Sequence, residues 1–372
     1  MKVIAFYLPQ FHSIPENDKW WGKGFTEWVN VKKATPLFPN HYQPRVPLNK
    51  NYYNLLDPET MKWQVELANE YGIYGFCFYH YWFSGKKLLE KPVEAFLQRK
   101  ELETHFCLCW ANESWTNTWA NGSADVIMQQ SYGGRNEWKE HFDYLLDYFK
   151  DDRYIVNNNK PLLVIYRPEL IDCLDEMLTY WNQLAKQNGF DGIEYAYQNV
   201  SYYLSSNRND ELFSYAIEYQ PNWVFALKNL SKLQRIKKDF LVFVEKKLKF
   251  NMREKLQVLK GLQRCDYAEI WNYILNSKPT TSISVPCAFV DWDNTPRKGK
   301  RGMVVENANP VDFKKFFAQL LDKAEKEFKQ DMVFIFAWNE WAEGGYLEPD
   351  EKYRYEYLKA IKYSLDEFEE RR

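Results

Sequence analysis

The feature that most constrains the fold is an alternation of two kinds of segment that repeats along the chain. Short runs of β-branched and aromatic residues alternate with stretches in which apolar residues recur at helical spacing. Such alternation is typical of parallel sheets, and most runs are apolar on both faces, as strands between a barrel interior and a helix layer are. The sequence therefore predicts an α/β fold, a single (β/α)8 TIM barrel. Its eight predicted strands begin at Val3, Ile73, Phe106, Leu162, Ile193, Tyr215, Ser284 and Val333.

The predicted helices follow the strands, and several have a recognisable start signal. Asp57 and Asn309 each precede a proline, the order of an N-cap residue and a proline at the first helical position. The fifth unit is the exception, because residues 205–212 hold at most a short turn. The helices are predicted over residues 58–71, 92–102, 138–149, 172–188, 310–328 and 353–368.

The length of 372 residues suits one barrel with enlarged loops, so we expect one catalytic domain over residues 1–372. Residues 10–54, after the first strand, form a loop too long for a simple connection, and this length predicts a functional role. Residues 227–275, after the sixth strand, are rich in Lys and Leu and predict a helical insertion. A lid, a partner-binding arm and padding all stay open as its role.

A doubly wound open sheet is the alternative architecture for alternating strands and helices. That fold would be expected to show a glycine-rich phosphate turn after an early strand. The first strand here ends in LPQFH instead. This ending argues against a dinucleotide site.

Composition bears on partners and compartment. A formal net charge of −2, with Lys and Arg spread along the chain, offers no patch for nucleic acid. The six cysteines are scattered and predict buried free thiols; Cys107 and Cys109 alone are a weak metal signal, and we expect neither metal nor cofactor. No apolar run reaches the ~18 residues of a membrane span, and the first residues suit a strand better than a secretory signal. We expect a cytoplasmic protein, a placement compatible with peripheral membrane association.

The candidate site lies where polar and aromatic residues gather at strand ends. Active sites of (β/α)8 barrels form at the C-terminal ends of the strands. Aromatic residues make up 18% of the chain, which suits either flat walls for sugars or a large core. We expect an oligosaccharide or polysaccharide substrate. The candidate substrate-contacting residues are His12, Trp28, Tyr79, His80, Trp110, Asn112, Glu113, Asp291, Trp292, Arg297, Asn339, Trp341 and Tyr346.

The strongest local signal is AWNEWAEGGYLEPD, at the end of the eighth predicted strand. If the chain turns after Glu340, that carboxylate and Glu343 become neighbours and can flank one bond. Hydrolysis of a glycosidic bond needs one protonated and one ionised carboxyl group, which a close pair in an aromatic pocket supplies. We therefore predict Glu340 and Glu343 as the catalytic residues.

Three other motifs offer competing interpretations. Glu113, in WANESW, is a rival catalytic acid. His80 lies among aromatic residues and is either a substrate contact or a hydrogen-bonded core residue. Asp291 and Asp293 form a DxD pattern, which a sugar-nucleotide transferase would use for a metal and diphosphate; at a strand end, sugar binding is the favoured interpretation.

The motifs together resemble one family. FYLPQFHSIPENDKWWGKGFTEWVNV, HYQPRVPL, YGIYGFCFYHYWF, CWANESW, YRP and WNEWAEGGYLEPD occur in this order between Ala5 and Asp350. They resemble the WbsX-like proteins of polysaccharide gene clusters, which are similar to glycoside hydrolase family 99. That family consists of (β/α)8-barrel endo-acting α-mannosidases and mannanases that retain anomeric configuration.

The resemblance implies a mechanism and leaves the reaction class open. By position, Glu340 would deprotonate the sugar 2-hydroxyl, which forms a 1,2-anhydro sugar, and Glu343 would be the general acid and then base. The leading hypothesis is a retaining endo-glycosidase acting on a cell-surface polysaccharide. The alternative is a glycosyltransferase or transglycosylase in O-antigen or capsular polysaccharide synthesis, because WbsX-like proteins carry that label. A third hypothesis, a catalytically silent sugar-binding barrel, is disfavoured by the presence of both glutamates.

Overall fold

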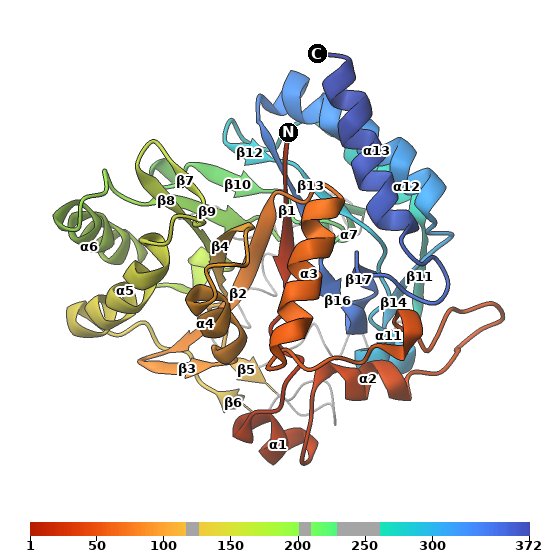
Figure 1. The fold of residues 1–372 in the computed structure, drawn as a ribbon, viewed down its shortest axis with the longest axis horizontal. Coiled ribbons are helices and arrows are strands. Elements are labelled where there is room, and N and C mark those ends of the chain that lie inside the picture. Colours follow the sequence, from red (N-terminus) through yellow and green to blue (C-terminus); the bar gives the residue numbers. More distant parts are fainter. Residues whose placement is uncertain (117–125, 201–209, 229–260) are drawn as a thin grey trace, which may run out of the picture.

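The computed structural model describes residues 1–372 except 117–125, 201–209 and 229–260 (Figure 1). Its main sheet is parallel and follows the order β12-β10-β9-β8-β4-β2-β1-β15-β13. The two ends of this path, β12 and β13, are the two halves of the seventh predicted strand, on either side of Pro286. The sheet therefore curls into a nearly closed barrel, which confirms the predicted fold class. The strands are β1 (Lys2–Tyr7), β2 (Gly75–Phe83), β4 (His105–Trp110), β8 (Lys160–Ile165), β9 (Glu194–Gln198), β10 (Tyr215–Ile217), β12 (Ser284–Val285), β13 (Cys287–Phe289) and β15 (Met332–Phe336).

The helices pack outside this sheet (Figure 1). Two predicted start signals are confirmed: the Asp57 side chain accepts a hydrogen bond from Glu59 N, and the Asn309 side chain accepts one from Asp312 N. In the fifth unit the described residues contain only a 3₁₀ turn, Asp210–Leu212. The helices of the outer layer are α3 (Pro58–Glu70), α4 (Lys91–Gln98), α5 (Arg135–Phe149), α6 (Leu174–Gln187), α10 (Tyr267–Asn276), α12 (Pro310–Lys323) and α13 (Glu356–Glu370).

Two enlarged connections depart from a bare barrel. The loop after β1 carries α1 (Pro15–Trp21) and α2 (Glu27–Lys33), and α2 packs against α11 (Thr295–Lys298), as Figure 1 shows. Most of the predicted insertion over 227–275 lies outside the described residues. Its described end differs from the expected helix, because β11 (Gln263–Asp266) pairs in parallel with β14 (Met303–Glu306) before α10 begins. α10 in turn packs against α12 and so belongs to the barrel's helix layer.

Small antiparallel pairings complete the described structure. β3 (Lys86–Leu88) pairs with β2, and β7 (Val156–Asn157) pairs with β8. β5 (Trp115–Thr116) pairs with β6 (Val126–Met128). β16 (Asn339–Glu340) and β17 (Gly345–Tyr346) form a hairpin after the eighth strand of the barrel.

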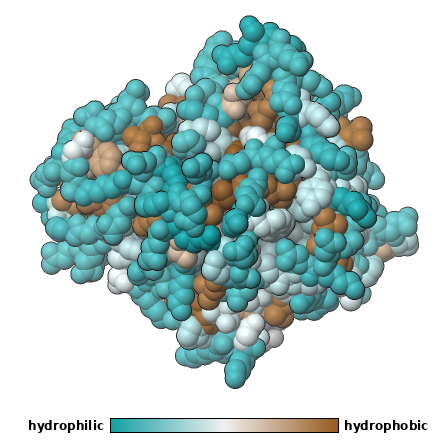
Figure 2. All heavy atoms as spheres, viewed as in Figure 1, coloured by the Kyte–Doolittle hydropathy of each residue, from teal (hydrophilic) through white to brown (hydrophobic). Residues whose placement is uncertain are grey.

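A continuous apolar core fills the barrel and the space between sheet and helices. All six cysteines are described and free, and Cys77, Cys107, Cys109 and Cys287 are buried. Hydrophilic residues cover much of the face shown in Figure 2, with apolar residues scattered between them. In the described part of the chain, no helix combines the length and the apolar composition that a membrane crossing requires.

Candidate active site

A cleft of about 560 Å³ opens where the barrel strands end. Aromatic and polar residues make up most of its lining, a combination that suits a sugar ring with its apolar faces and hydroxyl edges. The aromatic lining consists of Trp21, Tyr79, Tyr81, Trp115, Tyr166, Tyr219, Phe225 and Trp292. The polar lining includes Gln10, Asn17, Glu113, Asn222, Asn294, Arg297, Lys298, Glu340 and Glu343.

The two glutamates of the NEWAE stretch reach this cleft because the chain turns between them. Glu340 ends β16, and a single 3₁₀ turn, Trp341–Glu343, follows. Gly344 ends the turn with φ 71°, in the left-handed region that favours glycine. A Cβ atom at this position would lie 2.8 Å from the main-chain nitrogen of Asp293. The turn therefore needs a glycine here, and it sets both carboxylates in one cleft.

Arg297, in α11, connects the two carboxylates. Its Nη1 donates to Glu343 Oε1 at 2.5 Å, and its Nη2 donates to Glu340 Oε2 at 3.3 Å. The third side of the guanidinium faces Glu27, because Nε donates to Glu27 Oε2 at 3.2 Å. The Arg297 side chain is 7% exposed, so these ion pairs are largely removed from water. One buried cation is thus shared by three carboxylates.

The surroundings of Glu340 favour its protonated form. Burial raises the pKa of Glu340 to about 8; Arg297 opposes this effect, while Glu343 and Glu27 add to it through like charge. At neutral pH this pKa favours a proton on Glu340, beside the Glu343–Arg297 ion pair. A carboxyl pair with one proton can donate and accept protons on the same substrate.

Six of the predicted residues line the cleft: Tyr79, Glu113, Trp292, Arg297, Glu340 and Glu343. The Tyr79 hydroxyl lies 3.1 Å from the Tyr219 hydroxyl. Glu113 accepts from Arg167 Nη1 at 2.5 Å, and burial raises the pKa of the Glu113 carboxyl. The structure thus places Glu113 in the same cleft as the glutamate pair, with an arginine partner of its own.

The two predicted asparagines hold strand ends together behind the cleft. Asn339 is fully buried; its Oδ1 accepts from Leu8 N at 2.8 Å and its Nδ2 donates to Leu8 O at 3.0 Å. Asn112 is also fully buried, and exchanges hydrogen bonds of 2.8 Å with the main chain of Arg167. Both side chains tie the loop after one strand to the loop after its neighbour.

The predicted aromatic residues Trp28, Trp341 and Tyr346 lie beneath the glutamate turn. Trp341 stacks on Tyr346 with ring centroids 3.8 Å apart, and the Trp28 and Trp341 ring centroids are 5.4 Å apart in a tilted arrangement. Trp341 Nε1 donates to Glu348 Oε2 at 2.6 Å. These buried rings support the turn that carries Glu340 and Glu343.

The remaining predicted aromatic and histidine residues lie away from the cleft. His80 Nε2 is 2.8 Å from His141 Nε2 of α5, and Trp110 packs edge-on against the same ring. Burial lowers the pKa of His80 to about 3. His12 is buried as well, with Nδ1 3.0 Å from Pro9 O, and burial lowers its pKa to about 4.

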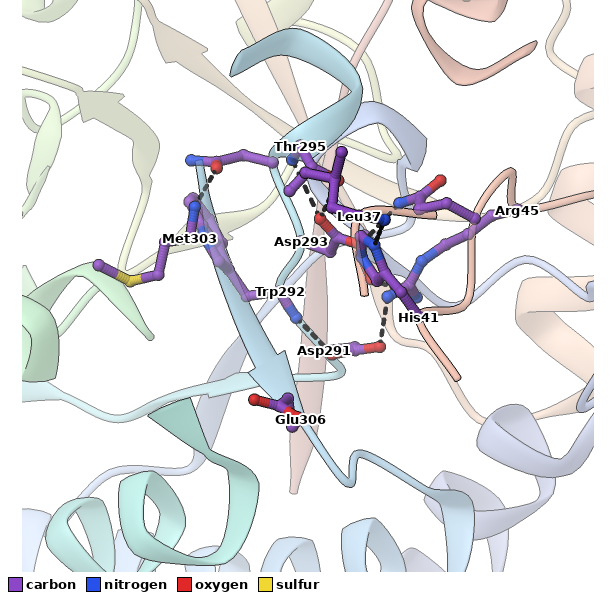
Figure 3. Close-up of polar contacts among 12 residues, drawn as sticks. Leu37, His41, Arg45, Asp291, Trp292, Asp293, Thr295, Met303 and Glu306 are labelled. Atoms are coloured by element: carbon purple, nitrogen blue, oxygen red, sulfur yellow. Dashed lines mark hydrogen bonds and ion pairs between the residues drawn. The ribbon is translucent and has the colours of Figure 1, made fainter. Parts of the chain in front are cut away.

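Asp291 and Asp293 point toward His41 and Arg45 of the first loop (Figure 3), whereas Trp292 and Asn294 line the cleft. Asp291 forms a buried ion pair with Arg45, in which Oδ2 lies 2.7 Å from Nη2. Asp293 Oδ2 accepts from Gln43 Nε2 at 2.6 Å and lies 2.8 Å from His41 Nε2. Side chains of the HYQPR stretch in the first loop thus contact both aspartates of the DxD pattern. Within the described ranges no group of three or more His, Cys, Asp or Glu residues could hold a metal ion.

Sequence reasoning missed several residues that line the cleft or contact its charged residues. Glu27, in α2, accepts a hydrogen bond from Arg297. Its place in the GFTEW block of the long first loop was the only sequence signal for it. Asn222 and Phe225 reach the cleft from α7 (Asn222–Lys228), where the sequence indicated the start of an insertion. Trp21 comes from α1 of the first loop.

Fold and site together define a (β/α)8-barrel protein with a paired-carboxylate cleft. The fold is similar to that of the GH99 endo-α-mannosidase from Bacteroides thetaiotaomicron, with a TM-score of 0.57 and 13% identity, over 99% of this chain and 97% of that one. A glycoside hydrolase-like protein is similar at a TM-score of 0.56 and 11% identity, over 98% of this chain and 93% of that one. At such low sequence identities, the similarity to these structures supports the fold alone.

Residues 3–361 match the family described as Glycosyltransferase WbsX, and the chain belongs to this family. Proteins called WxcX from two strains of Xanthomonas campestris pv. campestris are 35% identical over 365 residues. This match covers 98% of the chain and 49% of each relative, so the chain spans about half the length of those relatives.

Proposed function

We propose that this protein is a glycan-active enzyme that cleaves a glycosidic bond within a poly- or oligosaccharide of the cell surface, with retention of anomeric configuration. The observation that carries the proposal is the sharing of Arg297 by Glu340 and Glu343 at the floor of an aromatic-lined cleft. The endo-α-mannosidase fold and the carbohydrate-directed name of the family agree with it.

The chemistry needs one proton donor and one proton acceptor on either side of the anomeric carbon. In the mechanism implied by the family resemblance, Glu340 takes the proton of the sugar 2-hydroxyl while O2 attacks C1. The bond from C1 to the leaving oxygen breaks, and that oxygen takes a proton from Glu343. Water then opens the 1,2-anhydro sugar: Glu343 accepts a proton from water, and Glu340 returns its proton to O2. Two inversions at C1 give net retention.

The raised pKa of Glu340 favours the opposite placement of the proton, on Glu340, while Glu343 lies in short contact with Arg297. For the assigned roles, the proton must move from Glu340 to Glu343 when substrate enters. If the roles were exchanged, with Glu340 as the acid and Glu343 as the base, no such proton transfer would be needed. Kinetics on activated substrates separate the two assignments.

Transfer to a sugar acceptor is the second candidate function, favoured by the family's description as a glycosyltransferase. The same carboxylate pair would then activate an acceptor hydroxyl in place of water. A metal-dependent nucleotide-sugar transferase is less well supported, because the carboxylates of Asp291 and Asp293 both pair with side chains of the first loop.

The test is to incubate the full chain with α-mannan oligosaccharides and with bacterial O-antigen and capsular polysaccharides. Shortened products with retained configuration, read by NMR, would support the proposal if Glu340→Gln and Glu343→Gln abolish their formation. A parallel series contains EDTA or nucleotide sugars with Mn²⁺. Turnover that requires both a nucleotide sugar and the metal would replace hydrolysis by metal-dependent transfer.

A further inference from the structure

Glu27 is a third carboxylate at the glutamate pair, although it does not line the cleft. Its side chain has no exposed surface, and its Oε2 accepts from Arg297 Nε at 3.2 Å and from Asn30 Nδ2 at 3.4 Å. Within the described structure its Oε1 is buried without a hydrogen-bond partner. An ionised carboxylate is costly to bury in this way unless a nearby cation compensates it. Arg297 is that cation.

The guanidinium geometry shows what this contact does. An arginine presents its donors in a rigid plane, so fixing one edge fixes the direction of the others. Glu27 takes the Nε edge, which leaves Nη1 for Glu343 and Nη2 for Glu340. We infer that Glu27 is a positioning residue that holds Arg297 between the two catalytic carboxylates. This inference deepens the proposed function and rests on it for the word catalytic.

The neighbouring residue supports the same turn from below. Trp28 follows Glu27 in α2 and packs against Trp341, the residue that comes directly after Glu340. Glu27 thus acts on the charged side of the turn and Trp28 on its apolar side. The long loop after β1 therefore supplies parts of the catalytic centre, which gives its unusual length a physical reason.

Glu27 also affects the charge balance around Glu340. The groups that face Glu340 are Arg297 from α11, Glu343 from the following turn, Glu27 from α2, and the hydroxyls of Tyr79 and Tyr81 from β2 and of Tyr219 after β10. Among them, Glu27 and Glu343 raise the pKa of Glu340 and Arg297 lowers it. Without the charge of Glu27, Arg297 would act more strongly on Glu340 and lower its pKa.

The experiment measures the titration of Glu340 in the full chain without substrate. Carboxyl-¹³C glutamate is incorporated, and the Glu340 signal is identified as the one lost in Glu340→Gln. In Glu27→Gln, which keeps an acceptor for Arg297 Nε but removes the charge, we expect the Glu340 pKa to fall by on the order of 1 unit. The matched control is Glu218→Gln: Glu218 is another buried glutamate, but it accepts from Thr280 N. The control should leave Glu340 unchanged.

Each outcome decides the inference. An unchanged Glu340 titration in folded Glu27→Gln would overturn it, and so would an equal shift in Glu218→Gln. If Glu27→Gln does not fold while Glu27→Asp folds and titrates as wild type, Glu27 is a folding residue and the inference also fails. Because the titration uses no substrate, it tests Glu27 even if no tested glycan is cleaved. With an active substrate, Glu27→Gln should lower kcat and leave KM nearly unchanged.

Discussion

The main-chain N–H of Asp293 donates a hydrogen bond of 2.7 Å to the carbonyl oxygen of Glu343. This bond joins the segment after the seventh strand to the turn that carries the second glutamate. Asp293 is itself held by His41 of the first loop, as Figure 3 shows, and by Gln43 of the same loop. The position of Glu343 therefore depends on three segments that are far apart in the sequence.

Gly344 is where this arrangement is most sensitive to substitution. Gly344→Ala would place a Cβ at positive φ and within 2.8 Å of Asp293 N, so the turn must shift and move Glu343. We expect turnover to fall at least about tenfold, because small displacements of catalytic groups are costly. Gly189→Ala is the control: Gly189 also has positive φ, but its Cβ would meet nothing within 4 Å. Steady-state kinetics should show equal turnover for Gly189→Ala and wild type; a similar loss in both variants would contradict the prediction.

The Arg45–Asp291 ion pair should contribute to stability more than a surface pair does. Both side chains are at most 9% exposed, and Arg45→Leu would leave Asp291 buried and unpaired. Breaking a buried pair on one side costs about 3–5 kcal/mol, whereas an exposed pair contributes about 0–1 kcal/mol. Urea unfolding should show this difference between Arg45→Leu and Lys62→Met, which breaks the exposed Lys62–Glu66 pair. Equal losses in the two variants would show that Asp291 is not stabilised by its partner.

Buried histidines predict a loss of stability in mild acid. The pKa of His80 is lowered from 6.5 to about 3, so between these values the unfolded chain binds a proton that the folded chain does not. The free energy of unfolding therefore falls as pH falls through this window, by up to about 1.4 kcal/mol per pH unit for one such histidine. His80→Gln should reduce this slope in urea titrations between pH 6.5 and 5. His105→Gln, at an exposed position, should not; an unchanged slope in His80→Gln would refute the assignment.

The strands were predictable because their chemistry is local. Runs of β-branched and aromatic residues identified all eight barrel strands, with Pro286 dividing the seventh into two halves. The faces of those strands were harder to assign. Tyr79 and Tyr81 face the cleft, whereas His80 and Trp82 contact His141 of α5. Side chains alternate along a strand, but β2 is aromatic on both faces, so its sequence does not distinguish the inner face from the outer one.

The proximity of the two glutamates was predictable, whereas the contact of their shared partner Arg297 with Glu27 was not. Glu340 and Glu343 lie three residues apart at a strand end, so their proximity follows from one local turn. Glu27 and Arg297 are separated by 270 residues and meet only because α2 and α11 pack together at the mouth of the barrel. No periodicity or spacing in the sequence encodes that contact.

The roles of the two glutamates predict an asymmetry between their glutamine variants. If Glu343 is the general acid, Glu343→Gln should lower turnover of ordinary glycosides by about 10²–10⁴ and largely spare a substrate whose leaving group needs no proton. Glu340→Gln should be slow on both substrates, because nothing in the substrate replaces the base that prepares the 2-hydroxyl. For the same reason a 2-deoxy or 2-fluoro substrate should not react. Exchanged roles, with Glu340 as the acid and Glu343 as the base, would reverse the pattern, and the raised pKa of Glu340 favours this alternative. The measurement is steady-state kinetics of both variants on activated and unactivated glycosides, with the product anomer read by NMR. An inverted product would rule out the retaining mechanism through a 1,2-anhydro sugar, and variants as fast as wild type on both substrates would remove the glutamate pair from the mechanism.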